Sequence, residues 1–419
     1  MRRRITGALA VLLLGLPVAV AEPAAADISL PTVVSDNPVD WTPHVLDGNV
    51  WAIAVVGPTV IVAGDFTTVR DAVRGKKYTR NNIFAYTLTT GAVLPWAPSV
   101  DGPVLTVAAG PANTVYIGGS FETVNKVAQR GLARLSLNNG KRVAGYKASI
   151  NWGDVRSLIY RDSRLYAGGA FSAINGVVRA GLARLDPTTG AVDAGFDAKL
   201  TAPGLARVRV EDIALDPDGQ RLVILGALKL VDGVPRDQIA MLDVAGPHAV
   251  LTDWLTTAYS TPCLSGFDTY LRAVDFAPTG DYFVVVSTGR QAGPTMMCDA
   301  ATRFDTAGSG EHAPVWVNRT GGDSLYAVSV TGSAVYVSGH QRWMNNPLGK
   351  EAAGPGAVAR QGIAALDPSS GLVLPWNPSK DRGVGTRALV ATSAGLLVGS
   401  DTTRLGGEFH ARLGMFPLI

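Results

Sequence analysis

The strongest constraint on the fold is a short unit that recurs seven times along the chain. Its clearest copies are apolar strands that end in a small-residue turn and a phenylalanine, VIVAGDF at 60–66, VYIGGSF at 115–121 and LYAGGAF at 165–171. Weaker copies follow at 222–228, 282–289, 335–340 and 396–401. The copies lie about 56 residues apart, close to the periods of β-propeller repeats. One repeat architecture is therefore expected, although 419 residues would ordinarily suggest two or three domains.

Each copy is accompanied by three further elements. A short apolar stretch precedes it, as at 104–108, and a second trails it, as at 132–135 or 182–185. A turn such as DPTTG at 186–190 leads to an aromatic residue, and the seven aromatics are Trp41, Trp96, Tyr146, Phe196, Trp254, Trp316 and Trp376. Four short strands without any helix-period segment predict a four-stranded antiparallel sheet. Such sheets bury both faces when they stack radially around an axis.

The two ends of the chain complement each other. The last unit stops after its third strand at 413–416, and a spare copy of the aromatic element, VDWTP at 39–43, precedes the first unit. Pairing the two would close the ring and remove an open sheet edge. We therefore predict an all-β fold: a seven-bladed β-propeller of four-stranded antiparallel sheets over 38–419, its last blade closed by the N-terminal strand.

The first 26 residues have the pattern of a signal peptide. Three arginines precede an apolar run at 5–20, and AAA at 24–26 offers a cleavage site, which leaves 27–37 as an N-terminal lead-in. The alternative is a membrane anchor, but the run is shorter than the ~20 residues that a span needs. Without residues 1–26 the formal charge falls from +3 to +1, which excludes the strongly basic face of a nucleic-acid-binding protein. We expect a secreted, extracellular, monomeric protein that does not span a membrane.

The chain has only two cysteines, Cys263 and Cys298. Export to an oxidising compartment would let them form a disulfide. Two free cysteines are the alternative, and metal binding by two thiols without a nearby histidine is disfavoured. No metal or cofactor is expected.

Several strings carry a family resemblance. GAFSAING at 169–176 and RAGLARLDPTTG at 179–190 resemble the delta-60 β-propeller repeat of secreted bacterial proteins. The resemblance covers roughly 38–419, is strong in the second and third units and fades in the fourth to sixth. It implies a propeller fold and an exported bacterial protein. It supplies no catalytic residues, because no activity comes with the family.

Residues that recur in several units are expected to be architectural. Arginine stands three residues before the third strand at Arg80, Arg179, Arg236 and Arg360, which favours hydrogen bonds that fix a loop over ligand binding. Cys298 takes the equivalent place in the fifth unit. The string DPDG at 216–219 resembles the start of a calcium loop but lacks further ligands, so we interpret it as a hairpin turn.

Unrepeated loops are the candidate binding sites. One loop holds a cationic patch that could meet an anionic polymer or could be a hydrated surface, and its residues are Arg70, Arg74, Lys76 and Lys77. A long loop opens with His340, Arg342 and Trp343, which suit sugar stacking and acidic groups. Trp343 could instead fold onto the neighbouring blade. A third loop at 256–270 includes Cys263.

Catalytic motifs are mostly missing from the sequence. It contains neither a HExxH nor a GxSxG string. Asp154, Glu211 and Asp212 lie where first strands begin, near the mouth of the expected channel, and paired carboxylates there could serve a glycosidase. Two hypotheses follow. The first is a non-catalytic scaffold that recognises a glycan, a cell-wall polymer or a protein through its loops. The second is a carbohydrate-active hydrolase or lyase.

Overall fold

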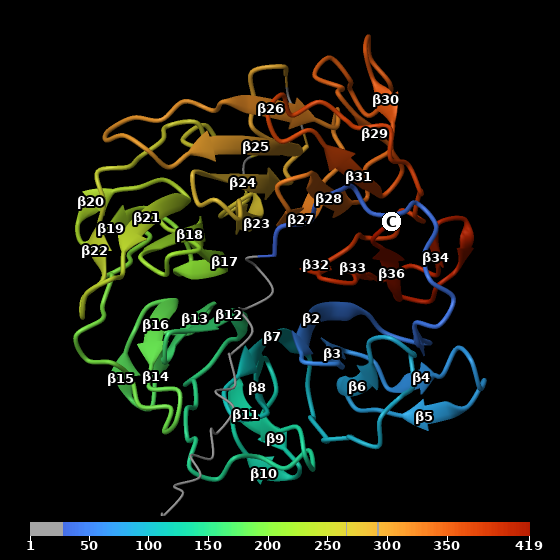
Figure 1. The fold of residues 1–419 in the computed structure, drawn as a ribbon. Helices are drawn as coiled ribbons and strands as arrows, with labels where there is room; N and C mark the ends of the chain where they lie inside the picture. Colours follow the sequence, from blue (N-terminus) through green and yellow to red (C-terminus); the bar gives the residue numbers. More distant parts are fainter. Residues whose placement is uncertain (1–27, 265, 291–292) are drawn as a thin grey trace, which may run out of the picture.

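A computed structural model describes residues 28–264, 266–290 and 293–419. The described chain is all β, and none of it forms a helix that could cross a lipid bilayer. Its strands form many small antiparallel sheets, of which seven are meanders that surround a common centre (Figure 1). The predicted signal peptide at 1–26 lies outside the described residues.

The first strand of each meander lies nearest the centre and contacts the first strands of its two neighbours, and β32 in turn contacts β2. These inner strands are β2 (Val50–Val56), β7 (Val104–Gly110), β12 (Val155–Arg161), β17 (Arg209–Leu215), β23 (Leu271–Phe276), β27 (Leu325–Val330) and β32 (Ala388–Thr392). The second strands are β3 (Thr59–Gly64), β8 (Thr114–Gly119), β13 (Arg164–Gly169), β18 (Arg221–Ala227), β24 (Tyr282–Ser287), β28 (Val335–Gly339) and β33 (Gly395–Gly399). The third strands are β6 (Ile83–Thr87), β11 (Leu132–Ser136), β16 (Leu182–Leu185), β21 (Ile239–Asp243), β25 (Ala300–Asp305), β31 (Ile363–Leu366) and β36 (Leu413–Pro417).

The expected fourth strand is fully formed in only two meanders, as β22 (Val250–Leu251) and β26 (Trp316–Arg319). In four others the equivalent segment makes one isolated bridge, for example Tyr86 with Val93. The segment after Val93 reads LPWAP, and proline has no N–H to donate to a sheet. Prolines therefore account for the weak pairing after Val93 and after Val373, whereas the segments after Arg142 and Val192 contain none.

Small hairpins project from the connections between second and third strands. The first of them is joined by β1 (His44–Val45). The hairpins are β4 (Thr68–Arg70) with β5 (Lys77–Thr79), β9 (Thr123–Val124) with β10 (Val127–Ala128), β14 (Ala173–Ile174) with β15 (Val177–Val178), β19 (Leu230–Val231) with β20 (Val234–Pro235), β29 (Trp343–Met344) with β30 (Val358–Ala359), and β34 (Arg404–Leu405) with β35 (Glu408–Phe409). Because second-strand ends pair with first-strand starts, as Gly64 does with Val50, these hairpins share a face with the starts of the inner strands.

Residues near the N-terminus lie along the last meander. The backbone N–H of Val39 donates to the carbonyl of Met415 (2.9 Å) and that of Ser35 to Pro417 (2.8 Å). Further along the chain, Val50 N–H donates to Ser400 (3.0 Å). Carbonyl groups of the outer strand β36 therefore accept hydrogen bonds from a segment near the other end of the chain.

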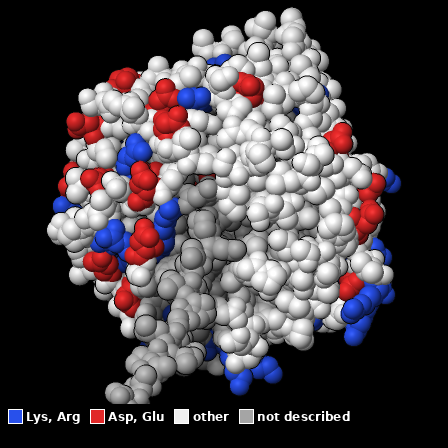
Figure 2. Space-filling model, viewed as in Figure 1, with Lys and Arg blue, Asp and Glu red and all other residues white. Residues whose placement is uncertain are grey.

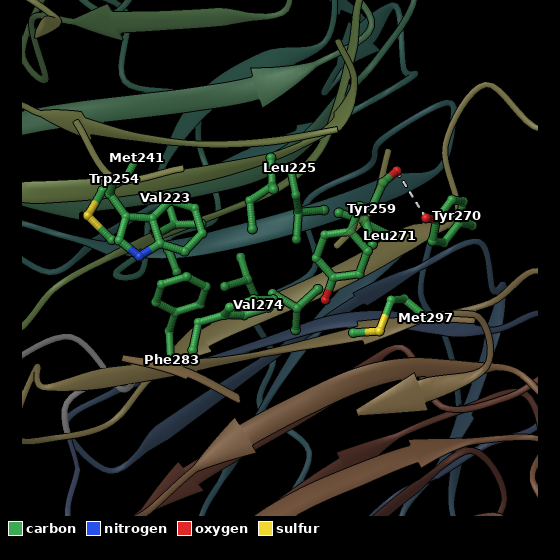
Figure 3. Packing of buried hydrophobic residues seen from close by; sticks show 14 of the residues in the cluster. Val223, Leu225, Met241, Trp254, Tyr259, Tyr270, Leu271, Val274, Phe283 and Met297 are labelled. Atoms are coloured by element: carbon green, nitrogen blue, oxygen red, sulfur yellow. Dashed lines mark hydrogen bonds between the residues drawn. The ribbon is translucent and has the colours of Figure 1, made fainter. Parts of the chain in front are cut away.

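Hydrophobic clusters fill the spaces between neighbouring meanders, including the space between the last and the first. Figure 3 shows the largest, between the fourth and fifth meanders, where Trp254 meets Phe283 with ring centroids 5.3 Å apart. Tyr259 and Tyr270 extend this cluster, and the Tyr270 hydroxyl donates to the Tyr259 carbonyl (3.1 Å). Each cluster uses side chains of two sheets, so no single sheet has a core of its own.

The repeated aromatic residues connect each meander to the next. Indole N–H groups donate to carbonyls of the following unit, Trp96 to Ser136 (2.9 Å), Trp254 to Asp305 (3.1 Å), Trp316 to Pro368 (2.9 Å), Trp376 to Ser35 (3.0 Å) and Trp41 to Leu88 (3.2 Å). The N-terminal segment takes part twice, as acceptor through Ser35 and as donor through Trp41. It therefore completes the same series of contacts that joins the other units.

Two tyrosines at equivalent positions of different units, Tyr336 and Tyr166, provide a test of how strongly the N-terminal segment is held. The buried Tyr336 hydroxyl accepts the N–H of Val34 (2.9 Å), whereas the buried Tyr166 hydroxyl, at the same place in an earlier unit, has no partner within the described chain. We expect Tyr336→Phe to lower the free energy of unfolding by about 1–3 kcal/mol, because it leaves a buried N–H unpaired. Tyr166→Phe should be neutral or stabilising. Urea unfolding measures both, and equal effects would contradict this role of Tyr336.

Candidate functional site

A central cavity of about 240 Å³ runs between the inner strands of all seven meanders. Its wall is mainly apolar, with Ile53, Val107 and Ile213 among its side chains. Polar atoms in the wall connect neighbouring inner strands: Thr106 Oγ1 accepts the N–H of Leu158 (3.1 Å). The cavity is thus a narrow, mainly apolar channel, and polar groups along it form hydrogen bonds that join neighbouring strands.

One mouth of this channel carries a set of special positions. In six meanders the register between the first and second strands shifts near the start of the first strand, after its first residue in five of them and after its second residue in β17, so that the next residue is left out of the ladder. A bulge of this kind re-aims a side chain. The six bulge residues, together with the residue that precedes β32, are called the mouth ring here, and its members are Trp51, Leu105, Arg156, Glu211, Arg272, Tyr326 and Arg387.

Glu211 is the acidic member of the mouth ring. Its carboxylate binds Arg156 Nη1 (2.7 Å) and Arg209 Nε (2.5 Å). Burial alone would raise the pKa of Glu211, but the charges of Arg156, Arg209 and Arg272 outweigh burial and hold it below its ordinary value. Asp154 binds the other side of the Arg156 guanidinium, at 2.8 and 3.0 Å. Two of the three predicted carboxylates therefore meet on one arginine.

Asp212 lies deeper, in the channel wall. One oxygen accepts the Ser157 hydroxyl (2.8 Å) and the other the N–H of Val274 (3.1 Å). Asp212 therefore links its own strand, β17, to both neighbouring inner strands, β12 and β23. Burial is the main cause that raises the pKa of Asp212 to about 6, against the lowering effect of these hydrogen bonds. The sequence placed it with Asp154 and Glu211, but its oxygens are committed to the neighbouring strands.

His340 and Arg342 come together around Asp323, a buried carboxylate that the sequence did not single out. Arg342 binds Asp323 through two side-chain hydrogen bonds (2.9 and 3.0 Å) and its backbone N–H (3.0 Å), and Arg382 adds a further side-chain bond (3.0 Å). Arg382 also donates to the backbone carbonyl of His340 (2.7 Å). Trp343 lies on β29 with the Arg342 guanidinium 4.3 Å from its ring centroid. These side chains are already paired with one another, which fixes their positions.

The cationic residues of the β4–β5 hairpin lie at the periphery (Figure 1). The guanidinium of Arg70 lies 5.4 Å from the ring centroid of Phe409, and Lys76 lies 5.0 Å from that of Tyr78. Arg74 and Lys77 are exposed. On the face that Figure 2 shows, Lys and Arg lie among Asp and Glu, without a broad area of one charge. The hairpin is a separate, solvated surface and does not belong to the mouth ring.

The recurring arginines have the architectural geometry that their repetition predicts. Each donates to the carbonyl of the residue before it and to a carbonyl of its own fourth segment, from Arg80 to Leu94 (3.0 Å), Arg179 to Asp193 (3.1 Å), Arg236 to Thr252 (3.1 Å) and Arg360 to Leu374 (2.7 Å). In the fifth unit, Cys298 forms the predicted disulfide with Cys263, with Cα atoms 5.8 Å apart.

The string at 216–219 forms a turn. Asp216 accepts the N–H of Gly219 (2.9 Å) through its carbonyl and binds Arg221 through its carboxylate (2.8 Å). Across 28–264, 266–290 and 293–419, no group of three or more His, Cys, Asp or Glu residues is placed to hold a metal ion.

Residues 161–196 match a family model described as "Domain of unknown function (DUF5122) beta-propeller". The chain contains a β-propeller domain. No curated protein matches the sequence. Among solved structures, the crystal structure of the computationally designed Ika8 protein aligns over 92% of this chain and 99% of its own, with 12% identity and a TM-score of 0.46.

Sequence reasoning missed Trp51, Arg272, Tyr326 and Arg387. They belong to no motif, and each lies in or directly before a mainly apolar strand. Their signal is positional: the mouth-ring position at the start of the first strand is charged or aromatic in six of the seven units of this propeller, with Leu105 the exception. Aligning the inner strands of the repeat with one another would have revealed the pattern.

The raised pKa of Asp212 predicts a pH-dependent contribution to stability. Because the folded state holds this proton more tightly than the unfolded chain, protonation stabilises the fold, and the contribution is lost as the pH rises through about 6. Between about pH 7 and pH 5 the propeller should gain about 1 kcal/mol from this group. Urea unfolding at both pH values measures it against Asp212→Asn, which cannot titrate. Parallel pH profiles of the two proteins would refute the prediction.

Proposed function

We propose that the chain is a secreted, monomeric, seven-bladed β-propeller of four-part blades, whose last blade is closed by the N-terminal segment. Support for this architecture comes from the seven meanders, from the contacts that lead around the inner strands from β2 to β32 and back, and from the hydrogen bonds of Ser35 and Val39 to β36. The disulfide of Cys263 and Cys298 is consistent with an oxidising, extracellular location.

The function that the geometry supports best is non-catalytic recognition of an extracellular ligand, a glycan, cell-wall polymer or protein. The mouth ring carries this proposal, because it gathers guanidinium groups and aromatic rings at one channel mouth, on the face where the hairpins stand. Such groups recognise acidic and sugar ligands through paired hydrogen bonds and stacking. The Arg342–Trp343 group and, further out at the periphery, the β4–β5 hairpin with Arg70, Arg74, Lys76 and Lys77 offer additional contact surfaces.

A carbohydrate-active hydrolase or lyase is the alternative, and it has less support. Glycosidases pair an ionised carboxylate with a protonated one that donates to the leaving group. Asp154 and Glu211 both bind Arg156, and the surrounding arginines keep the pKa of Glu211 low, so that Glu211 does not serve as the acid. Asp212 has the raised pKa, but neighbouring strands occupy both of its oxygens.

A binding and turnover assay tests the proposal. Purified protein is titrated with soluble cell-wall polysaccharide fractions, and retention and new reducing ends are measured together. We expect saturable binding without product. Arg272→Gln should weaken binding about tenfold, because one charged hydrogen-bond donor is lost at the mouth.

Lys141→Gln is the matched control, since this exposed lysine lies in a turn after β11, on the opposite face. Binding that Arg272→Gln and Lys141→Gln leave equally unchanged would place recognition elsewhere. Product release that disappears in Glu211→Gln would establish the hydrolase instead.

A further inference from the structure

A small cavity of about 90 Å³ lies beside the mouth ring, between the last and the first meanders. Trp51 comes to it from β2, and Arg387 from the residue before β32. Gly385, Asn49 and Asp401 complete the part of its wall that matters here. The cavity has room for about three water molecules at about 30 Å³ each, which suits a single acid group and is too small for a sugar ring.

The Arg387 guanidinium is held by stacking alone. Its central carbon lies 4.0 Å from the ring centroid of Tyr326 and 5.1 Å from that of Trp51. Within the part of the chain that the structure describes, it makes no side-chain hydrogen bond and no ion pair within 4 Å. A guanidinium stacked between rings is fixed in orientation, while the N–H donors around its edge stay available.

A second donor of the cavity also lacks a partner. The indole nitrogen of Trp51 is buried and has no hydrogen-bond acceptor among the described residues. Indole and guanidinium nitrogens donate and cannot accept. Five other tryptophans pair their indole N–H with a backbone carbonyl, so the unpaired Trp51 is a departure from the pattern of this fold. Trp51 and Arg387 thus bring two donors without an acceptor among the described residues to the wall of one cavity.

The nearby carboxylates are already engaged. Asp401 accepts the backbone N–H groups of Val384 (2.5 Å) and Gly385 (3.2 Å). Glu211, across the mouth, is bound by Arg156 and Arg209. Arg272 adds a further positive charge and pairs with no carboxylate in the described chain; its donors go to the carbonyls of Thr269 and Leu271.

Burial lowers the pKa of Arg387, and the charges of Asp401 and Glu211 only partly offset it. The cavity therefore holds a desolvated positive charge without a direct counter-ion.

The backbone at Gly385 keeps this arrangement open. Its φ is +137°, and a Cβ at this position would lie 2.8 Å from Cδ2 of Tyr326 and 2.9 Å from the backbone of Gly339. Any side chain here would push Tyr326 away from its place over Arg387. The close approach that glycine permits is thus part of what positions the guanidinium.

We propose that this cavity binds one oxyanion, a carboxylate or a phosphate, carried by the ligand that the propeller recognises at its mouth. Arg387 would donate to the anion from the edge of its guanidinium, and the Trp51 indole N–H would donate from the first meander. The inference rests on the proposed recognition function and deepens it, because it makes the ligand acidic. An acidic sugar or a phosphodiester polymer would supply such a group, and a neutral glycan would not.

Calorimetric titration with galacturonate, glycerol phosphate and neutral galactose tests the site. We expect binding of at least one of the two anions at millimolar concentration or below, weakening with added salt, and no binding of galactose. A response to galacturonate alone indicates an acidic glycan as the source, and a response to glycerol phosphate alone indicates a phosphodiester polymer. Absence of binding of both anions overturns the proposal.

Three variants locate the anion. Arg387→Gln should weaken binding about tenfold to hundredfold, because a charged donor is lost, and Trp51→Phe, which keeps a stacking ring but removes the indole N–H, about threefold to tenfold. Arg404→Gln is the control: it removes the same charge from an exposed arginine of the same meander, whose side chain reaches only the Gly407 carbonyl (3.2 Å). Urea unfolding verifies that each variant is folded. Equal affinities of Arg387→Gln, Trp51→Phe and Arg404→Gln would refute the assignment.

The same variants separate this inference from the proposed function. If Arg387→Gln and wild type retain cell-wall polysaccharide equally, recognition stands and the cavity is not its site. If the small anions bind through Arg387 but no polymer or protein fraction is retained, the cavity assignment stands and the proposed recognition of polymers falls.

Discussion

The contact on which the structure most depends is the one between the fourth segment of each unit and the meander that follows it. A meander of three short strands cannot bury both of its faces, so every cluster of the core is shared between two sheets. The repeated tryptophans fix that sharing, since each combines a large apolar ring with an N–H that selects one carbonyl of the next unit. Trp376 binds Ser35 and Trp41 binds Leu88, so the N-terminal segment takes part in the same kind of contact.

The repeat could be predicted from sequence because it is periodic, and the strands and the role of the recurring arginines followed from it, whereas the disulfide was predicted from the expected export of the chain. The full fourth strand did not, and in the first and sixth units the prolines at 95, 98, 375 and 378 remove hydrogen-bond donors from that segment. The convergence of Arg342 and Arg382 on Asp323 was missed, since it joins residues from different meanders. Spacing along a chain does not reveal which side chains of neighbouring sheets point toward each other.

The bulge near the start of the inner strands links the architecture to the candidate site. In six of the seven meanders one extra residue, polar or aromatic in every case but Leu105, turns its side chain away from the ladder and toward the mouth. The next position, occupied by Thr106, Ser157 and Asp212, returns to the wall and bonds to the neighbouring inner strand. A single irregularity therefore divides adjacent residues into a group that holds the sheets together and a group that faces out of the channel. Glu211 and Asp212 illustrate this division, with opposite pKa shifts at adjacent positions.

The balance of charge across the protein bears on how the small cavity beside the mouth ring can select a ligand. The protein as a whole is close to neutral, with 37 Lys and Arg residues against 34 Asp and Glu, so long-range attraction contributes little to ligand choice. Selectivity must then come from short-range contacts at groups that the fold leaves unsatisfied. Most buried donors here are paired. The arginines beside Asp154, Glu211 and Asp323 form ion pairs with these carboxylates, so their charges neutralise each other. Arg387 and Trp51 are the donors at the mouth that the described chain does not satisfy, and they point to an acceptor from outside it.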